Sequence, residues 1–214
     1  MAFVVIGTIM LFVSWLFFNG ASTASLFVPR EQSVSKIMMV TIISGCSSGL
    51  LASFLKPHIS KRYSKRYRYD VGALCNGLLS GCVSITGVCD NVDPWAALII
   101  GLIGGLIYVL SARIIERIGV DDPIEASSVH GICGLWGCIA VGIFHRQEGL
   151  ISPSENSFNF LMIQFLGILV ICAWTILLSG IYFLIMKRAG LLRVSLIEEL
   201  LGLDVAELGS KARF

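Results

Sequence analysis

Charged residues are scarce in this chain. They make up 14% of its 214 residues, whereas 56% are hydrophobic and the mean hydropathy is +0.84. A soluble globular core does not need so apolar a composition. Sixteen basic residues are nearly balanced by fourteen acidic ones, which leaves a formal net charge of only +2. The composition therefore excludes an ordinary soluble domain and argues against a nucleic-acid partner.

Metal-binding patterns are also missing. The seven cysteines lie mostly inside apolar segments, and they form no CxxC pair and no Cys/His spacing typical of a metal site. We interpret them as small packing residues without chemistry of their own. They are Cys46, Cys75, Cys82, Cys89, Cys133, Cys138 and Cys172.

What the chain has in abundance is apolar runs of about 20 residues, the length that crosses the hydrocarbon core of a bilayer. They predict an all-α, polytopic membrane protein with six transmembrane helices. A transmembrane region is expected over residues 1–186 and a cytoplasmic tail over residues 187–214. The six predicted spans are Ala2–Phe18, Ile37–Leu55, Val71–Cys89, Pro94–Ala112, Pro123–Phe144 and Phe160–Met186.

The distribution of Lys and Arg predicts the orientation. Thirteen of the sixteen basic residues lie in the connection at 56–68, after the fourth span, or after the sixth span. The other three, Arg30, Lys36 and Arg146, fall in the remaining connections. Because basic residues favour the cytoplasmic side, both termini are expected in the cytoplasm. The basic connection could instead be a docking site for anionic lipid.

The first apolar run begins directly after Met1, with no positively charged segment before it and no convincing cleavage site behind it. We therefore expect a membrane span here and not a signal peptide. A chain that starts in this way is a fragment, a truncated gene product or a genuine short form.

Small residues recur at four-residue spacing inside the spans, a pattern that lets helix backbones approach closely. Taken together they predict a tight bundle. The positions are Gly45 and Gly49; Ala73, Gly77 and Gly81; and Gly101 and Gly105.

The fifth span begins with a pattern typical of a helix start. Asp122 fits the N-cap position, Pro123 fits the first helical position, and Glu125 fits the acid of a capping box. We expect these three residues to have structural roles.

His130 follows eight residues after the predicted cap, roughly 12 Å along a helix at 1.5 Å per residue. That distance takes an ionisable ring well toward the middle of the bilayer. Gly134 and Gly137 are expected on the same face, which would leave room for a narrow pore wall. On spacing alone, a pore-lining imidazole and a neutral histidine hydrogen-bonded between helices are equally plausible.

Residues 121–144, DDPIEASSVHGICGLWGCIAVGIF, closely resemble the signature helix of ammonium transporters, a family that also includes the Rhesus glycoproteins. Other segments are similar to further helices of the family and to its cytoplasmic regulatory tail. These are residues 8–22, 72–77, 85–90, 93–101 and 192–204. The resemblance covers nearly the whole chain.

The resemblance implies half of an inverted-repeat channel fold. Family members have two inverted five-helix repeats and a final helix, and this chain aligns with the second repeat and that last helix. The first repeat, with a partner histidine, an acidic residue and further aromatic residues of the outer vestibule, is not present in it. Because such sites lie between the repeats, the chain carries half of a pore wall.

The resemblance also implies roles for three residues. Phe18 would be one ring of an aromatic gate, Ser22 would accept a hydrogen bond from ammonium at the outer mouth, and His130 would be a pore histidine. Without the resemblance, a lipid-facing Phe18 and a loop Ser22 would be the favoured interpretations. The implied activity is the passage of ammonium or ammonia across a lipid bilayer, in the plasma membrane and as a homotrimer, with no enzymatic reaction and no metal, nucleotide or organic cofactor. A non-conducting subunit that joins and modulates a transporter trimer is the alternative.

Overall fold

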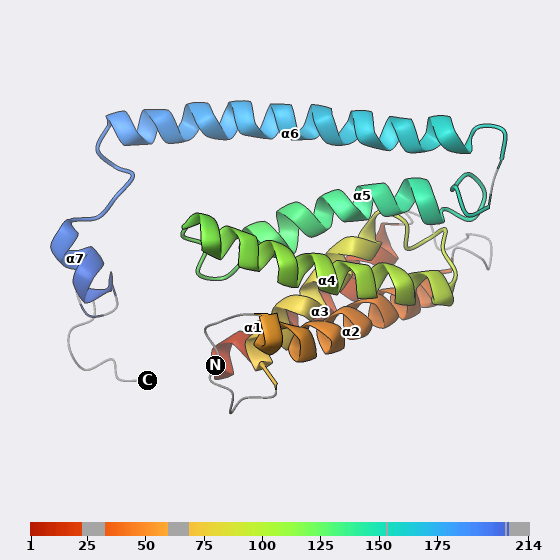
Figure 1. The fold of residues 1–214 in the computed structure, drawn as a ribbon, viewed down its shortest axis with the longest axis horizontal. Coiled ribbons are helices and arrows are strands. Elements are labelled where there is room, and N and C mark those ends of the chain that lie inside the picture. Colours follow the sequence, from red (N-terminus) through yellow and green to blue (C-terminus); the bar gives the residue numbers. More distant parts are fainter. Residues whose placement is uncertain (23–32, 60–68, 153, 204, 206–214) are drawn as a thin grey trace. The chain divides into compact units, whose positions relative to one another are not determined.

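The computed structural model describes residues 1–22, 33–59, 69–152, 154–203 and 205. Within these ranges the chain is helical and contains no strand, in agreement with the predicted all-α class. Figure 1 shows the order of the helices. They are α1 (Ala2–Ala21), α2 (Val34–Ile59), α3 (Val71–Thr86), α4 (Pro94–Ile118), the π-helix η2 (Ser127–Ile132), α5 (Cys133–Phe144), α6 (Ser157–Arg188) and α7 (Leu196–Leu201).

Five helical segments in the described part of the chain are long and apolar enough to cross a membrane: α1, α2, α4, η2 with α5, and α6. The third predicted span, Val71–Cys89, is shorter than expected. Helix α3 has 16 residues and ends at Thr86, because residues 87–90 form a turn in place of the predicted last helical turn. At about 1.5 Å per residue α3 is roughly 24 Å long, less than the hydrocarbon core. Helices α1, α2, α4 and α6 run a few residues past their predicted ends, whereas the fifth span begins later than predicted and ends at Phe144 as predicted.

The core of the bundle is a seam of glycine and serine between α2, α3 and α4. A Cβ atom added at Gly81 would lie 2.3 Å from the carbonyl oxygen of Ser44, and one at Gly101 would lie 2.3 Å from the same oxygen. The hydroxyl of Ser44 donates to the Gly81 carbonyl oxygen at 2.8 Å, and that of Ser48 donates to the Gly77 carbonyl oxygen at 2.5 Å. The predicted tight packing through small residues is therefore present, and serine hydroxyls reinforce it.

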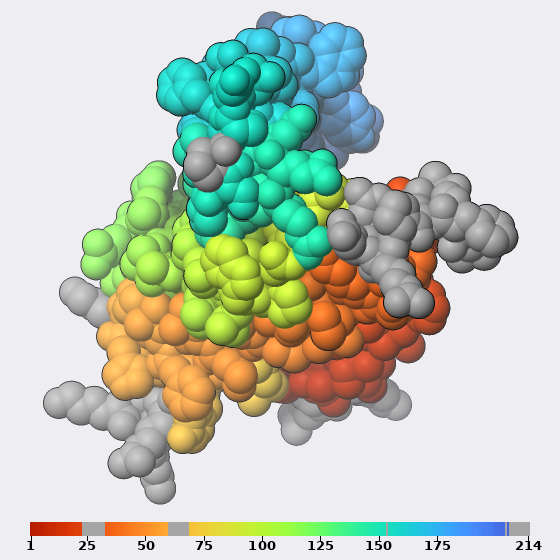
Figure 2. All heavy atoms as spheres, turned by 90° about the vertical axis from the view of Figure 1, so that its right-hand side faces the viewer, coloured from red at the N-terminus to blue at the C-terminus, as the bar shows by residue number. Residues whose placement is uncertain are grey.

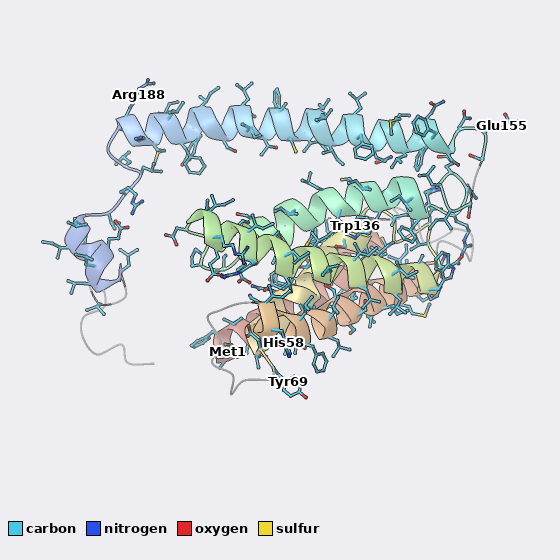
Figure 3. All side chains as sticks on the ribbon, viewed as in Figure 1. Met1, His58, Tyr69, Trp136, Glu155 and Arg188 are labelled. Atoms are coloured by element: carbon cyan, nitrogen blue, oxygen red, sulfur yellow. The ribbon has the colours of Figure 1, made fainter. Side chains whose placement is uncertain are left out.

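Apolar side chains fill the space on either side of this seam. Seen from one end in Figure 2, the orange α2 lies between the red α1 and the yellow-green start of α4 and packs against both. The largest fully buried side chain is Tyr108 of α4. At one end of the bundle lie Met1, His58 at the end of α2 and Tyr69 before α3 (Figure 3). The N-terminus, the end of α2 and the residue before α3 thus lie at the same end of the bundle.

The chain divides into two compact units, residues 1–168 and residues 169–214. Within the first unit, the beginning of α6 packs on α5, where Leu161 fills the space over Gly142 and Phe160 lies 5.3 Å from the His145 ring. Within the second unit, α7 begins with a capping box in which Ser195 and Glu198 each bind the other's backbone amide. The basic residues at 30, 61–68, 211 and 213 that entered the orientation prediction lie outside the described residues.

Candidate functional site

Trp15 of α1 connects three elements on one face of the bundle. Its indole N–H donates to the Thr86 hydroxyl of α3 at 2.8 Å, and that hydroxyl in turn donates to the Cys82 carbonyl oxygen at 2.7 Å. On η2, the imidazole of His130 stacks on Trp15 with 6.2 Å between ring centroids and 17° between ring planes. These contacts fix the indole plane and, with it, the orientation of the histidine ring.

His130 is exposed. Its imidazole has no hydrogen-bond partner within the part of the chain that the structure describes, and the indole of Trp15 is its ring contact there. The hydrogen-bonded bridge between helices that we considered from the sequence is thus not formed among these residues. An ionisable ring on an open apolar face is costly in lipid, so such residues normally face a cavity or another part of the protein.

Phe18 extends the aromatic surface one turn further along α1. Its ring meets Trp15 edge-on at 6.5 Å, with 69° between planes, and the side chain is 60% exposed. Because α1 continues as a helix through Ala21, Ser22 follows Phe18 by one turn. The Ser22 hydroxyl donates to the Phe18 carbonyl oxygen at 2.7 Å, and a hydroxyl that donates one hydrogen bond is also able to accept one from an N–H donor.

His130 lies in a π-helix, a form that is rare and occurs mostly at functional sites. The wider turn changes which residues share its face. We predicted Gly134 and Gly137 on the face of His130, but a Cβ at Gly137 would lie 3.1 Å from the carbonyl oxygens of Val83 and Ser84. Gly137 therefore allows α5 to approach α3, and the prediction that it lines the pore beside His130 is wrong.

The start of this span also differs from the expected helix start. The helical residues begin at Ala126, and Pro123 lies in a turn before them. The carboxylate of Asp122 still accepts hydrogen bonds from the amides of Ala126 and Ser127, each at 2.9 Å. It therefore caps the helix from a position further back than an N-cap residue, because the turn at Pro123 returns the chain toward it.

Glu125 does not close a capping box. Its backbone adopts φ 59°, the left-handed conformation that costs a residue other than glycine about 1–2 kcal/mol. Lys56 Nζ of α2 donates to both carboxylate oxygens at 2.5 and 2.6 Å, and Asn76 Nδ2 of α3 donates to one of them at 2.9 Å. The hydroxyl of Tyr108 on α4 also donates to the carboxylate. Glu125 thus joins three helices to the turn before η2.

The ion pair controls the protonation of Glu125. Burial raises the pKa of the carboxyl, but the hydrogen bonds from Lys56 and Tyr108 and the positive charge of Lys56 outweigh burial and hold the pKa below the ordinary value of glutamate. The carboxylate is therefore charged at neutral pH.

A cavity of about 310 Å³ opens beside this ion pair. It is lined by the ends of α2 and α4 and by the connection at 120–125, and neither Trp15 nor His130 contributes to it. The aromatic face and this cavity are therefore separate features of the bundle.

Sequence reasoning missed Trp15, Thr86, Lys56 and Tyr108 as partners of the predicted residues. The signal for Trp15 was its position three residues before Phe18, which places both rings on one side of a helix. Lys56 and Tyr108 lie 69 and 17 residues from Glu125 in the sequence, and no local pattern connects them.

The described residues contain no group of three or more His, Cys, Asp or Glu side chains that could hold a metal ion. The chemistry that this face offers is instead that of aromatic rings, a hydroxyl oxygen and an imidazole. Aromatic faces attract cations, the hydroxyl accepts N–H donors, and an imidazole is a group that can both accept and donate a proton.

Comparison with known proteins gives a consistent result. The pattern of the family described as Ammonium Transporter Family matches residues 1–213. The putative ammonium transporter 1 member 5 of Arabidopsis thaliana is 33% identical over 98% of this chain and 45% of its own length. Ammonium transporter Amt2 of Archaeoglobus fulgidus is 33% identical over 97% of this chain and 44% of its own length.

Solved structures agree in fold. A structure titled Sensor Amt Protein superposes with a TM-score of 0.80 at 34% identity, covering 95% of this chain and 48% of its own. Mep2 of Saccharomyces cerevisiae gives a TM-score of 0.78 at 27% identity, with 98% and 48% covered. The chain spans about half the length of the relatives it matches. By its sequence over nearly its full length and by its fold, the chain belongs to the ammonium transporter family.

Proposed function

We propose that the face formed by Trp15, Phe18, Ser22 and His130 is one wall of a path for ammonium across the membrane. The observation that carries this proposal is the stacking of an exposed imidazole on an indole, with a second aromatic ring and a hydroxyl group further along α1. The four side chains lie on one open face. Membership of the family supports ammonium as the substrate.

Each of these side chains has a physical role in the proposed path. Ammonium loses favourable hydration when it leaves water, and oxygen acceptors and aromatic faces compensate for part of that loss. The lone pairs of Ser22 accept one N–H of the ion, while Phe18 and Trp15 offer their ring faces. Deprotonation near His130 lets neutral ammonia continue through an apolar passage, with the imidazole as the proton-exchanging group.

The second wall of the path belongs to the proposal as well. It is supplied by a longer form of this protein or by a separately encoded first half, since the chain spans about half the length of its relatives. In the assembled form we propose a homotrimer with one path per subunit, located in the plasma membrane with both ends of this chain in the cytoplasm. The tail would touch a neighbouring subunit.

A non-conducting role is the second candidate. The exposed His130 and the half-length match also fit a membrane subunit that joins transporter trimers and modulates them without a complete path of its own. The two candidates differ in whether the aromatic face must be covered by a first repeat for ammonium to pass.

Uptake in cells that lack ammonium transporters tests the proposal. Expressed alone, the chain should reach the membrane and give no uptake, because half of the wall is missing. Co-expression with the first repeat of a complete relative should restore uptake, and His130→Ala should then change its rate or its proton coupling. Uptake by the chain alone would overturn the half-wall assignment. If uptake does not appear in a correctly assembled pair, the non-conducting candidate is supported.

A further inference from the structure

Glu125 combines an unfavourable backbone conformation with several strong contacts of its side chain. Its left-handed backbone is unfavourable for a side chain with a Cβ, yet Lys56, Asn76 and Tyr108 converge on its carboxylate from α2, α3 and α4. Strain of this kind persists only where the surrounding contacts fix the conformation. The contacts to Glu125 therefore determine the path of the chain at this point.

The fixed turn leads directly into η2. The carbonyl oxygen of Glu125 accepts the amide of Val129 at 3.0 Å, and the carboxylate of Asp122 accepts the amides of Ala126 and Ser127. The first turn of the segment that carries His130 is thus anchored at its start. Since residues along a helix are related by a fixed rotation, a change at this start would turn the imidazole away from Trp15.

We propose that Glu125 is a positioning residue for His130. Its contacts with Lys56, Asn76 and Tyr108, which we call the Glu125 clasp, hold the first turn of η2 in the one setting that places the imidazole on Trp15. The clasp touches neither the ring nor the aromatic face and acts through the backbone. That His130 handles the proton of ammonium rests on the proposed function, whereas its positioning by the clasp does not.

The charge of the carboxylate is essential to the clasp. The side chain of Lys56 is only 12% exposed, so its ammonium group depends on Glu125 for compensation. A second ion pair near the same end of α4, between Arg113 and Glu116, lies within one helix, and among the described residues no hydrogen bond joins it to the turn at Glu125. It provides a matched control for the loss of a nearby ion pair.

Fluorescence of Trp15 can report the position of the imidazole. In the full chain in detergent micelles, with Trp95→Phe, Trp136→Phe and Trp174→Phe, Trp15 is the remaining indole. Contact of the stacked imidazole with the indole quenches the emission of Trp15, measured at one fixed pH. His130→Gln should abolish this quenching and thereby assign it.

Three further variants test the clasp in this background. Glu125→Gln removes the charge, and Lys56→Gln with Glu125→Gln removes both charges and leaves no unpaired ion. In both, the quenching of Trp15 by the imidazole should fall by at least half, and amide hydrogen exchange of residues 126–132 should become roughly tenfold faster while the α2–α4 core stays protected. Arg113→Gln with Glu116→Gln should retain the quenching and the slow exchange.

A doubly neutral variant that keeps both the full quenching and the slow exchange overturns the proposal. Loss of the whole fold in that variant also overturns it, because the pair would then serve the stability of the bundle. The emission of Trp15 and the hydrogen exchange are both measured on the chain itself and do not require transport. Failure of the chain to support ammonium uptake would leave the positioning by Glu125 standing.

Discussion

At the scale of single residues, the imidazole of His130 is the group on which the proposed path depends. Its stacking on Trp15 and the hydrogen bond from Trp15 to Thr86 orient the ring without using either of its nitrogens. Both nitrogens therefore stay available to a substrate or to water. A purely structural histidine would instead use them for bonds to neighbouring helices.

Replacement of His130 separates these two roles. In a transporter completed by a first repeat, His130→Ala should leave expression and trimer stability close to normal, because no described side chain loses a hydrogen bond. Transport rate or proton coupling should change. The measurements are the ammonium-evoked current, which reports transport, and the detergent-resistant assembly, which reports trimer stability, both made on the same preparations.

His58→Ala is the matched control, since it removes an exposed imidazole at the end of α2. This variant should leave both the ammonium-evoked current and the detergent-resistant assembly unchanged. Lost assembly without a specific change in transport would return His130 to a structural role.

Glu125 gives the chain a sensitivity to acid. The pKa of its carboxyl is lower in the folded protein than in the unfolded chain, where glutamate titrates at about 4.3. The unfolded state thus binds more protons between the two values, and the stability due to Glu125 is present above about pH 4.3 and lost as the pH falls through the folded pKa. The melting temperature of the wild-type chain should decline in this acid range.

In the double variant Lys56→Gln with Glu125→Gln, the melting temperature should fall less steeply as the pH is lowered. Glu116→Gln, which removes a partly exposed carboxylate from the neighbouring pair, serves as the control and should follow the wild type. Equal slopes in all three proteins would contradict the assignment of the acid sensitivity to Glu125.

At the scale of the elements, the α2–α3–α4 seam leaves no room for an added methyl group. Gly81→Ala would place its Cβ 2.3 Å from the Ser44 carbonyl oxygen, which belongs to backbone and cannot swing aside. Overpacking of this kind typically costs 1–3 kcal/mol or more, so we expect at least about 2 kcal/mol of lost stability. Thermal unfolding in detergent measures it.

Gly7→Ala provides the comparison within the same chain. Nothing lies within 4 Å of a Cβ at Gly7, so the change should be neutral or slightly stabilising, as expected from the higher helix propensity of alanine. Similar melting temperatures for Gly81→Ala and Gly7→Ala would show that the seam relaxes more easily than its geometry indicates.

The elements show how far sequence reasoning reaches. Long apolar runs predict the helices well because membrane insertion requires length and hydropathy, which are local properties. The end of α3 was predicted too late because residues 87–89 continue the apolar run, whereas residues 87–90 form a turn in the structure. The residues Asp-Pro-Ile-Glu at 122–125 fit the pattern of a capping box. In the structure, Glu125 instead binds Lys56, Asn76 and Tyr108, which are distant in the sequence. The π-helix at His130 likewise depends on packing and has no local sequence signal.

The residues of the candidate site also differ in how far the sequence predicts their arrangement. Phe18 and Ser22 were placed one turn apart from spacing alone, and α1 continues through Asn19 as that placement required. The stacking of His130 on Trp15 joins residues 115 positions apart, so a single sequence offers no means to find it.

At the scale of the whole molecule, the orientation in the membrane is the property that the sequence predicts most directly. A tag inserted between Lys61 and Arg68 should be protected from outside reagents in intact cells, because the basic residues there favour the cytoplasm. A tag between Gln147 and Asn156 should be accessible. Labelling before and after permeabilisation distinguishes the two sides.

The opposite pattern would reverse the orientation and move Phe18 and Ser22 to the inner mouth. Both insertion points lie in connections, so the bundle itself should tolerate the tags. A tag after Met1 provides an internal check, because Met1 and the end of α2 lie at the same end of the bundle (Figure 3) and should behave alike.

The glycine and serine seam also has a mechanical consequence. Sliding α3 along α2 by one residue would drive the Ser44 carbonyl oxygen out of the space that Gly81 leaves for it and break the hydroxyl bonds that cross the seam. Helices α2, α3 and α4 therefore behave as a stiff frame with little compliance. In the proposed path, movement is then expected in elements outside this frame, among them α1 and η2, which carry the stacked rings of Trp15 and His130.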